Sequence, residues 1–368
     1  MIDNCSCTGG TTTTASGEGG RTYGGGIYAL SNVDALRMTI SSCSLLGGTP
    51  GAGGIGGESG GAGLYTSTPG GTMTVSLQLV SIENCDAVSP SGGFAFGGGI
   101  AGYTQITLLE SEIDQCTAAG SGGGIHYEGS ESVQITRSTI SNCTGTGVSA
   151  ISSPSFVFIN CTISTNNGGA LTGGIDVTGA VVQLSFSTVT ANQGATWGGV
   201  RRSAGSLSII GCIIAANAGS GSATDLDAAA SMTVQNSVIG IQDPDAIAQD
   251  GVNGNQVGSV GTPLDAKLSG LAGNGGPTST HALLAGSPAI DMGGAISPPS
   301  TDQRNAPRTI GPADAGSYEY GATPPNTGGT SGGEGDSRCA VSGSAGLGWL
   351  LLLGLLAAMA TAGRLRRE

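Results

Sequence analysis

Three acidic residues have the spacing in this sequence that most suggests chemistry. Glu110, Glu112 and Asp114 alternate along one short segment, which places them on the same face of a β-strand. Enzymes that cleave polysaccharides use carboxylates as acid and base, usually beside basic residues. The carboxylates of this chain are otherwise scattered. We therefore interpret the three as a solvated outer face and predict no catalytic residue.

One basic and aromatic pairing stands out further along the chain. Arg201 and Arg202 follow Trp197 after two glycines and a valine. Such a pairing can grip a glycan through stacking and hydrogen bonds, and it also occurs at exposed corners. Aromatic residues make up only 4% of the chain, so the stacking platforms of sugar-cleaving clefts are expected to be scarce.

Oxygen ligands gather in one short stretch, at Asp243, Asp245, Asp250, Asn253 and Asn255. They resemble a calcium loop, but the EF-hand spacing is missing, and a turn-rich excursion explains them equally well. Calcium is thus the one cofactor considered, and no metal-ligating or cofactor-binding residue is predicted.

The histidines and cysteines do not indicate zinc. His126 and His281 lie far apart, and Cys5 and Cys7 are separated by a single residue, which fits no zinc pattern. Neither histidine has a Ser or Cys partner that the sequence identifies. We interpret both as structural.

The composition favours a repetitive acidic fold. Glycine makes up 70 of the 368 residues, and the formal net charge is −13. Abundant Val, Ile and Leu favour a fold with many tight corners over disorder. Lys267 is the only lysine, and three of the basic residues, Arg364, Arg366 and Arg367, lie in the last five positions. The remaining acidic chain is not expected to bind nucleic acid.

A sequence repeat accounts for the high glycine content. The pattern apolar-x-apolar-x-x-(Ser/Cys)-x-apolar-x-x-(Asn/Cys) starts at Met38, Val75, Ile106, Val133, Phe156, Val182, Leu207 and Met232. A glycine pair followed by an aliphatic residue precedes most copies, as at Gly124-Ile125 and Gly174-Ile175. Each repeat therefore holds about three short strands separated by glycine-rich corners.

Three strands in about 25 residues describe one coil of a parallel β-helix. We predict an all-β, right-handed, single-stranded parallel β-helix of about eight coils over residues 1–240. A β-propeller needs about 40 residues and four strands per blade, so it is excluded by the spacing.

Equivalent residues of successive coils are expected to stack about 4.8 Å apart. The inward columns are then Val133/Phe156/Val182/Leu207 and Ile135/Phe158/Leu184/Ile209. One further column is predicted to form a structural ladder, with hydrogen-bonded amides and, in three consecutive earlier coils, cysteines: Asn166, Asn192, Asn217, Cys85, Cys116 and Cys143. These cysteines are within disulfide reach of one another, but in-register stacking points their side chains the same way, so we favour buried thiols.

The first residues match the end of a repeat. Residues 2–5 (IDNC) correspond to residues 82–85 (IENC) and 140–143 (ISNC). From this match we expect an N-terminally truncated helix without its signal peptide and cap, and with an unpaired sheet edge.

The glycine-pair and apolar-x-x-Asn signals resemble the repeats of polymorphic outer membrane proteins. A more specific resemblance is to choice-of-anchor Q domain proteins, carried by residues 274–291 (NGGPTSTHALLAGSPAID), 302–304 (DQR) and 314–320 (DAGSYEY). Asn305 stands where that family usually has glycine, and Ala315 where it has isoleucine; Asn tolerates the left-handed conformation. The resemblance implies location at the cell surface and supplies no activity.

We predict a loop excursion at 241–262 and a choice-of-anchor-Q-like cap at 263–322. In the cap, Pro277, Pro288 and Pro307 break the repeat. Leu283, Leu284 and Ile290 are expected to cover the last open coil.

The tail resembles a bacterial C-terminal sorting signal. A Gly/Ser/Thr/Pro-rich spacer (323–344) precedes an uncharged apolar segment (345–363) and a basic end (364–368). The apolar segment is near the lower limit for a transmembrane helix, and the arginines are expected to stay cytoplasmic. Cys339 is a possible processing site of the myxobacterial type, although Arg338 stands where glycine usually precedes that cysteine.

Together these observations predict a membrane-anchored protein of the bacterial cell surface or outer membrane. Its expected partners are the membrane, a sorting protease, and surface glycans or proteins. The predicted function is structural, adhesive or binding; the alternative is a polysaccharide-active lyase or glycosidase on the same scaffold.

Overall fold

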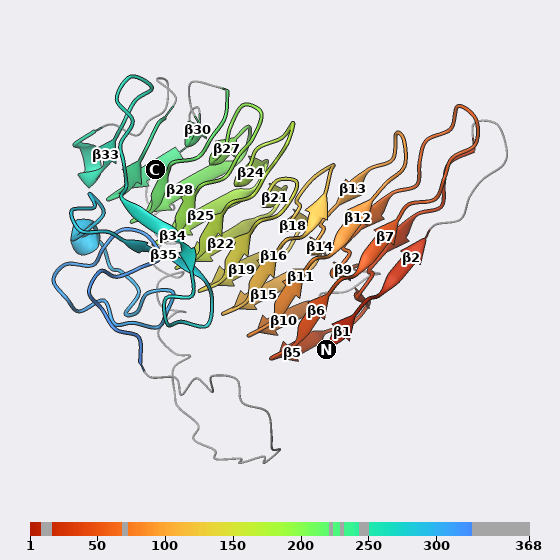
Figure 1. The fold of residues 1–368 in the computed structure, drawn as a ribbon, viewed down its shortest axis with the longest axis horizontal. Helices are drawn as coiled ribbons and strands as arrows, with labels where there is room; N and C mark the ends of the chain where they lie inside the picture. Colours follow the sequence, from red (N-terminus) through yellow and green to blue (C-terminus); the bar gives the residue numbers. More distant parts are fainter. Residues whose placement is uncertain (9–16, 68–72, 221–223, 229–231, 243–249, 326–368) are drawn as a thin grey trace, which may run out of the picture. The chain divides into compact units, whose positions relative to one another are not determined.

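A computed structural model describes residues 1–8, 17–67, 73–220, 224–228, 232–242 and 250–325. The described residues form a parallel β-solenoid with almost no helix, in which each coil contributes one strand to each of three long sheets (Figure 1). The predicted transmembrane segment, the basic end, Cys339, Asp243 and Asp245 lie outside the described residues.

The first strand of a coil belongs to the β4–β30 sheet, which comprises β4 (Ile27–Ala29), β9 (Leu64–Thr66), β14 (Ile100–Gly102), β18 (Ile125–Glu128), β21 (Val148–Ile151), β24 (Ile175–Thr178), β27 (Val200–Arg202) and β30 (Leu226–Ala228). The second belongs to the β5–β31 sheet, which comprises β5 (Val33–Leu36), β10 (Thr74–Gln78), β15 (Gln105–Leu109), β19 (Ser132–Thr136), β22 (Ser155–Ile159), β25 (Val181–Ser185), β28 (Ser206–Ile210) and β31 (Met232–Gln235).

The third strand belongs to the β1–β33 sheet, which comprises β1 (Ile2–Asp3), β6 (Thr39–Ser41), β11 (Ser81–Glu83), β16 (Glu112–Asp114), β20 (Thr139–Ser141), β23 (Thr162–Ser164), β26 (Thr188–Thr190), β29 (Ile213–Ala215), β32 (Val238–Ile239) and β33 (Gln256–Val257). Six strands of the β5–β31 sheet are five residues long, and the first and last have four. The solenoid thus has about six turns with full-length strands, slightly fewer than the eight turns expected.

The predicted stacking is confirmed by the strand register. Val133 pairs with Phe156, Phe156 with Val182 and Val182 with Leu207. All four side chains are buried in one core that runs through the coils. Ile2 likewise pairs with Ile40, so the first residues take the repeat position that their sequence predicts.

The glycine pairs are explained by close packing between coils. A Cβ atom on Gly124 would lie 2.6 Å from the carbonyl oxygen of Gly147 and 2.6 Å from Cγ2 of Ile140. Gly99 is crowded in the same way by Ile113 and Gly124. No side chain fits at this corner, because the backbone of the next coil and the core residue of the same coil already occupy the space.

The interior column predicted as a ladder changes chemistry halfway along the solenoid. Asn166 Nδ2 donates to Asn192 Oδ1 at 2.9 Å, and Asn192 Nδ2 donates to Asn217 Oδ1 at 2.9 Å. The backbone N–H of Cys143 donates to Asn166 Oδ1, which joins the thiol part of the column to the amide part. Asp225, which sequence reasoning missed, ends the column by accepting from Asn217.

The described cysteines are all free thiols, and six of them are buried: Cys43, Cys85, Cys116, Cys143, Cys161 and Cys212. Burial raises the pKa of Cys43 to about 12, so the thiol stays protonated and behaves as a small apolar side chain.

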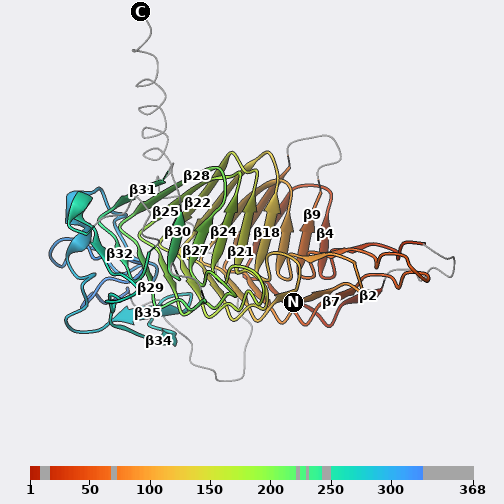
Figure 2. The ribbon, with the colours of Figure 1, turned by 90° about the horizontal axis from the view of Figure 1, so that it is seen from above.

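The early coils carry a two-layered arm between their third and first strands. One layer comprises β2 (Ser6–Thr8), β7 (Ser44–Leu46), β12 (Asp86–Val88) and β17 (Thr117–Ala118), and the other comprises β3 (Thr22–Tyr23), β8 (Ser59–Gly60) and β13 (Ala95–Phe96). Strands β2 and β7 project away from the three long sheets (Figure 2).

The C-terminal segment (residues 263–322) does not simply cover the last coil as predicted. It contains the antiparallel pair β34 (Leu268–Ala272) and β35 (Thr280–Leu283) and the 3₁₀ turn η2 (Met292–Ala295). Its hydrogen bonds run along the outside of the solenoid, from Asn236 back to Glu110. Leu283 is buried, whereas Leu284 remains 47% exposed.

The C-terminal segment docks along the solenoid because of the side chains on the outer face of the β1–β33 sheet. Its middle strands present small hydroxyl side chains that are buried beneath the segment, such as Thr139, Thr162 and Thr188. Thr139 Oγ1 donates to the carbonyl of Ser279, and the backbone N–H of Ser317 donates to Thr188 Oγ1. Short hydroxyls leave room for a backbone to approach and supply its hydrogen bonds.

The predicted loop excursion (241–262) also belongs partly to the solenoid. It contains η1 (Val252–Gly254), and β33 adds a strand beside β32. Buried Asn255 accepts from the backbone of Ser237 and donates to the carbonyl of Val234. Its amide therefore completes a coil and is not directed at a cation.

Candidate functional site

A row of outward side chains follows the β4–β30 sheet along the solenoid axis. In each coil it is the residue directly after the inward aliphatic one, as Tyr28 follows Ile27 and Tyr65 follows Leu64. The register carries this outward row through Tyr28, Tyr65, Ala101, His126, Ser149, Asp176, Arg201 and Asp227. Aromatic residues occupy its beginning and charged residues its end.

The beginning of the row belongs to a connected patch that we name the aromatic face, made of Tyr23, Tyr28, Tyr65, Phe94, Phe96, Tyr103 and His126. Tyr65 stacks between two rings, with centroids 4.7 Å from Tyr23 and 5.1 Å from Tyr28. Tyr103 lies 5.6 Å from Tyr65 in a tilted arrangement. Tyr23 and Phe96 come from arm strands, so the patch joins the arm to the β4–β30 sheet.

His126 is a buried member of the aromatic face. Its ring centroid is 5.0 Å from that of Phe96 and 6.4 Å from that of Tyr103, and the residue is only 3% exposed. Nδ1 lies 3.0 Å from the hydroxyl of Ser121. Burial lowers the pKa of His126 to about 4. The more exposed carboxylate of Glu128, 3.9 Å from Nε2, does not offset that effect.

The rim of the aromatic face carries charge. The hydroxyl of Tyr23 donates to Glu58 Oε2 at 2.9 Å, and Arg21 forms an ion pair with the same oxygen at 3.4 Å. Burial raises the pKa of Tyr65 to about 12, so this phenol is neutral at physiological pH. The patch offers apolar ring surface with hydroxyl, carboxylate and guanidinium groups beside it.

At the end of the outward row, Arg201 contacts Trp197, the basic and aromatic pair noted in the sequence. The guanidinium carbon of Arg201 lies 4.4 Å from the ring centroid of Trp197, and its Nη1 lies 3.4 Å from Asp176 Oδ2. Burial raises the pKa of Asp176, and Arg201 counteracts part of this shift. Arg202 turns aside, since its Nε and Nη2 donate to the carbonyl of Gly205.

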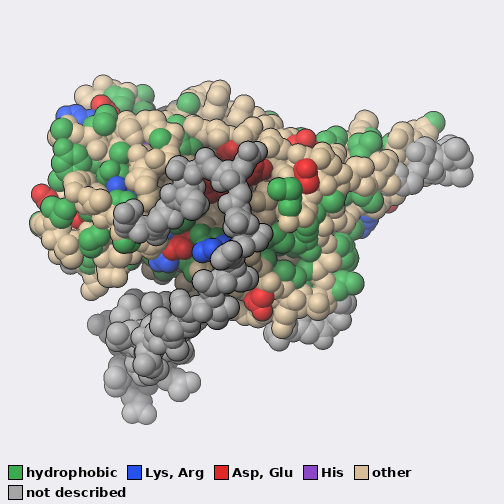
Figure 3. All heavy atoms as spheres, turned by 60° about the horizontal axis from the view of Figure 1, so that its bottom comes forward, with side chains coloured by type: hydrophobic (Ala, Val, Ile, Leu, Met, Phe, Trp, Pro, Cys, Tyr) green, Lys and Arg blue, Asp and Glu red, His purple; other side chains and the backbone are tan. Residues whose placement is uncertain are grey.

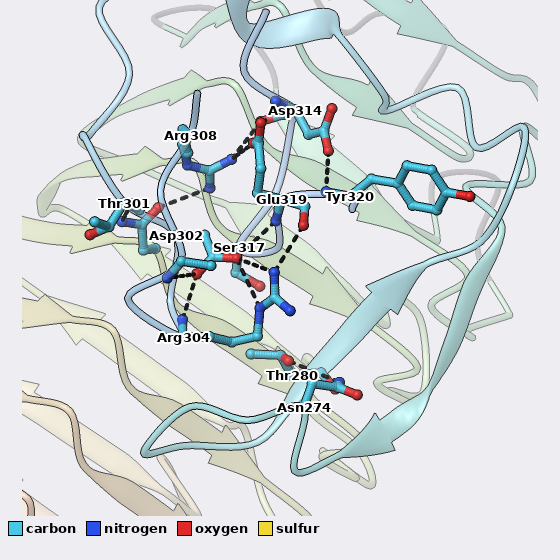
Figure 4. Close-up of polar contacts among 12 residues, drawn as sticks. Asn274, Thr280, Thr301, Asp302, Arg304, Arg308, Asp314, Ser317, Glu319 and Tyr320 are labelled. Atoms are coloured by element: carbon cyan, nitrogen blue, oxygen red, sulfur yellow. Dashed lines mark hydrogen bonds and ion pairs between the residues drawn. The ribbon is translucent and has the colours of Figure 1, made fainter. Parts of the chain in front are cut away.

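Four residues of the choice-of-anchor resemblance form a second polar cluster together with Arg308, and we name this cluster the C-terminal lock: Asp302, Arg304, Arg308, Asp314 and Glu319 (Figure 4). Arg304 donates to Asp302 Oδ2 through Nε at 2.9 Å and through Nη2 at 2.6 Å. Its guanidinium carbon lies 3.5 Å from the ring centroid of Tyr318. These contacts fold the segment onto itself.

Arg308, which sequence reasoning missed, joins the lock to the solenoid. Its Nη1 donates to Glu319 Oε2 at 2.9 Å, and its Nη2 donates to Asn160 Oδ1 at 3.1 Å. The side chains of Arg308 and Glu319 are both 0% exposed. Burial lowers the pKa of Arg308 and raises the pKa of Glu319, while their mutual attraction opposes both shifts. Removing one partner of such a pair is costly, because the other charge then stays buried without compensation.

The acidic residues singled out first are not a solvated face, and that interpretation is wrong for two of the three. Glu110 Oε1 accepts from Asn305 and pairs with Arg137 at 2.9 Å, and Glu112 Oε1 accepts from the backbone of Ser279. Asp114 accepts from its neighbours Ser141 and Asn142. The first two carboxylates are engaged because the C-terminal segment returns to their side of the solenoid.

The remaining candidates are engaged in local structure. His281 lies between the hydroxyl of Ser164 and the carbonyl of Ser269, 2.7 Å from each. Asp250 accepts from the backbone of Val257. Within the described ranges, no group of three or more His, Cys, Asp or Glu residues is arranged to hold a metal ion.

The aromatic face was missed because composition averages over the chain. Part of its signal was present in the residue that follows each glycine-pair-aliphatic motif, which is Tyr28, Ala101, His126, Asp176 or Arg201. Tyr65 follows the related sequence Ala62-Gly63-Leu64. On the face shown in Figure 3, charged side chains form a few small groups separated by polar and apolar surface.

Comparisons with known proteins identify the fold family. The model of a right-handed β-helix region matches residues 1–199 and 96–257. Searches of curated proteins and of solved structures found no match. Among residues 1–325, so far as they are described, no helix is long and apolar enough to cross a membrane. Since the matched residues make up more than half of its length, the chain belongs to the right-handed β-helix family.

Proposed function

We propose that this chain is a bacterial surface protein that acts by binding and is held at the surface through its C-terminal part. The observation that carries the proposal is the C-terminal lock. Asp302 and Glu319, which belong to the residues of the choice-of-anchor resemblance, are buried at 0% exposure and bind within the segment, and Arg308 between them fastens it to Asn160 of the solenoid. Carboxylates that are buried and bound to arginines in this way support a structural role for the segment more than acid–base chemistry.

The outward row supports a binding role. Its charged members Asp176 and Arg201 pair with each other, and its aromatic members present a ring-lined surface at the other end. Exposed ring surface of this kind is typical of recognition sites.

Surface attachment is tested with the full chain expressed behind a bacterial secretion signal. Replacing Leu352 and Leu355 with arginine places two charges in the apolar tail and is expected to release the protein into the medium. Replacing both with isoleucine is the matched control and should preserve display, which is measured by antibody labelling of intact cells. Retention of the arginine variant at wild-type level would overturn attachment through the tail.

Processing at Cys339 is a separate part of this proposal. In the same assay, Cys339→Ser is expected to reduce mature surface protein and to accumulate the unprocessed form. Unchanged display would reject a processing role for this cysteine while leaving attachment itself standing.

A polysaccharide-active enzyme is the second candidate, favoured by one observation. Asp176, Arg201 and Asp227 occupy adjacent coils in register, which puts two carboxylates and a cation in one line. Raised pKa values are typical of general acids, and burial raises the pKa of Asp176. Release of new sugar ends from a polysaccharide, abolished by Asp176→Asn, would establish this function; the absence of release across a polysaccharide panel would remove it.

A further inference from the structure

The outer face of the β5–β31 sheet carries no charged side chain from β10 to β31. The residues that alternate with the buried ones on these seven strands are all Ser, Thr, Gln, Val, Leu or Ile. The whole chain, by contrast, has a formal net charge of −13. An uncharged face can pack against another surface without the cost of desolvating ions, and depletion of charge is typical of the centre of protein interfaces.

The central row of this face reads the same in both directions by chemical class. From β10 to β31 it consists of Ser76, Thr107, Gln134, Val157, Gln183, Ser208 and Thr233. Val157 on β22 lies in the middle, with a glutamine on each side and two hydroxyl residues at each end. Strand β22 is also the middle one of the seven strands (Figure 1).

The row two residues further along each strand has the same symmetry. It consists of Gln78, Leu109, Thr136, Ile159, Ser185, Ile210 and Gln235. It is therefore centred on β22 as well, at Ile159. The row two residues before the central one does not share the symmetry, because Ser132 and Val181 occupy its places on either side of β22.

Two rows that are symmetric about one strand fit a second copy of the same chain. In a two-fold symmetric interface, residue i of one copy meets residue j of the other, and j meets i. A two-fold axis that lies between two such faces, parallel to β22, places Val157 of one copy against Val157 of the other. The same rotation reverses the order of the coils, so Gln134 meets Gln183 of the second copy. Each of these amides can both donate and accept a hydrogen bond.

The exposure and the size of the face agree with a reversible dimer. Gln134 and Gln183 are exposed, and Val157 and Ile159 are partly exposed at the centre. An apolar centre with a polar rim is typical of interfaces between proteins. Seven strands of about five residues cover about 17 Å by about 30 Å, which gives about 1,000 Å² for two faces. Since this area is near the lower limit for a specific interface, we expect a dissociation constant in the micromolar range.

We propose that the outer face of the β5–β31 sheet, from β10 to β31, is a self-complementary interface through which two copies of this chain pair with their solenoids antiparallel. The proposal goes beyond the binding role described above, because the partner is a second copy and surface attachment is not required. The C-terminal segment docks on the β1–β33 sheet, so it does not compete for this face.

The first test is sedimentation velocity of the full chain, in a mild detergent that shields its apolar tail, at about 1 to 100 μM protein. Wild type is expected to change from monomer to dimer across this range. Val157→Arg places two guanidinium groups against each other at the axis and is expected to weaken dimerisation at least about tenfold. Gln193→Arg is the control for an added charge. Gln193 is exposed and lies outside the face, after β26, so this variant should dimerise as wild type does.

The second test addresses the orientation of the two copies. Gln183→Arg alone is expected to weaken dimerisation severalfold, and adding Gln134→Glu to the same chain should restore it, because the two new charges then meet across the axis. Within one chain these positions lie two coils apart, about 10 Å, so they compensate each other little. Both glutamines are exposed, and the midpoint of thermal unfolding should therefore stay close to that of wild type in both variants.

Three results would each overturn the proposal: a wild type that stays monomeric at about 100 μM, dimers of Val157→Arg that are as tight as those of wild type, or a Gln134→Glu/Gln183→Arg chain that dimerises no better than Gln183→Arg. Association through the apolar tail is recognised by its insensitivity to all of these substitutions.

Discussion

The early coils and the late coils of this solenoid share one backbone path and differ in what covers it. In the early coils, thiols such as Cys85 and Cys116 fill the interior column, and aromatic rings line the outside. In the late coils, amides such as Asn192 fill the same column, and the C-terminal segment covers the outer face of the β1–β33 sheet.

This difference shows that inward positions of the repeat set the coil geometry, whereas outward positions set the surface chemistry. Inward aliphatic residues keep the register through both halves, as Ile100 pairs with Ile125 early and Ile175 with Val200 late. Outward residues are free of that constraint, so one half can be sealed by a lock and the other left open to a ligand.

The largest effect is expected from breaking the lock. Arg308→Met leaves Glu319 buried without its partner, and such a change costs about 3–5 kcal/mol of unfolding free energy. Urea unfolding measures it, and adding Glu319→Gln should recover part of the loss. Arg21→Met, which removes the exposed ion pair of the aromatic face, is the matched control and should unfold as wild type does. Similar effects of Arg308→Met and Arg21→Met would contradict the division into a sealed and an open half.

The second largest expected effect is a loss of stability at low pH, which is caused by His126 in the early coils. Burial lowers the pKa of His126 to about 4, whereas an unfolded histidine has a pKa of about 6.5. Between these values the unfolded chain binds a proton that the folded chain does not, so the folded state loses about 3 kcal/mol as pH falls from 6.5 to 4.

Urea unfolding of wild type and His126→Phe at pH 7, 5.5 and 4 isolates this contribution, since all other titrating groups are common to both proteins. The variant should lose less stability across the window. Parallel pH profiles would show that the imidazole is not desolvated beneath the rings.

The smallest effect tests the interior column. Asn192→Ala removes the acceptor of the Asn166 backbone N–H and one of the two acceptors of its side-chain amide, and it is expected to cost about 2 kcal/mol. Asn192→Cys introduces the thiol that the early coils use and should cost about half as much. Denaturant midpoints of the two variants decide this, and equal losses would mean that thiols and amides are not alternative fillings of one column.

The lock and the aromatic face also differ in how far the sequence predicted them. Residues 302–304 and 314–320 were singled out by resemblance, yet their burial was not predictable, and neither was the hydrogen bond from the neighbouring Arg308 to Asn160. The left-handed conformation of Asn305, with φ of 66°, matches the expectation drawn from the family's glycine. The aromatic face was missed because its rings lie up to 80 residues apart in the sequence, as Tyr23 and Tyr103 do.

The three strands of each coil, the repeat length and the inward columns were predictable from the sequence. They depend on the local alternation of apolar and polar residues and on the glycine corners that each repeat encodes. Only the tertiary structure decided that the C-terminal segment returns to Glu110 and Glu112, and that tyrosines of different coils stack into one patch. In a solenoid, residues one repeat apart in the sequence become neighbours in space, so the repeat length predicts their contacts. The docking of a non-repeating segment against the side of the solenoid depends on hydrogen bonds and shape complementarity, which the repeat length does not reflect.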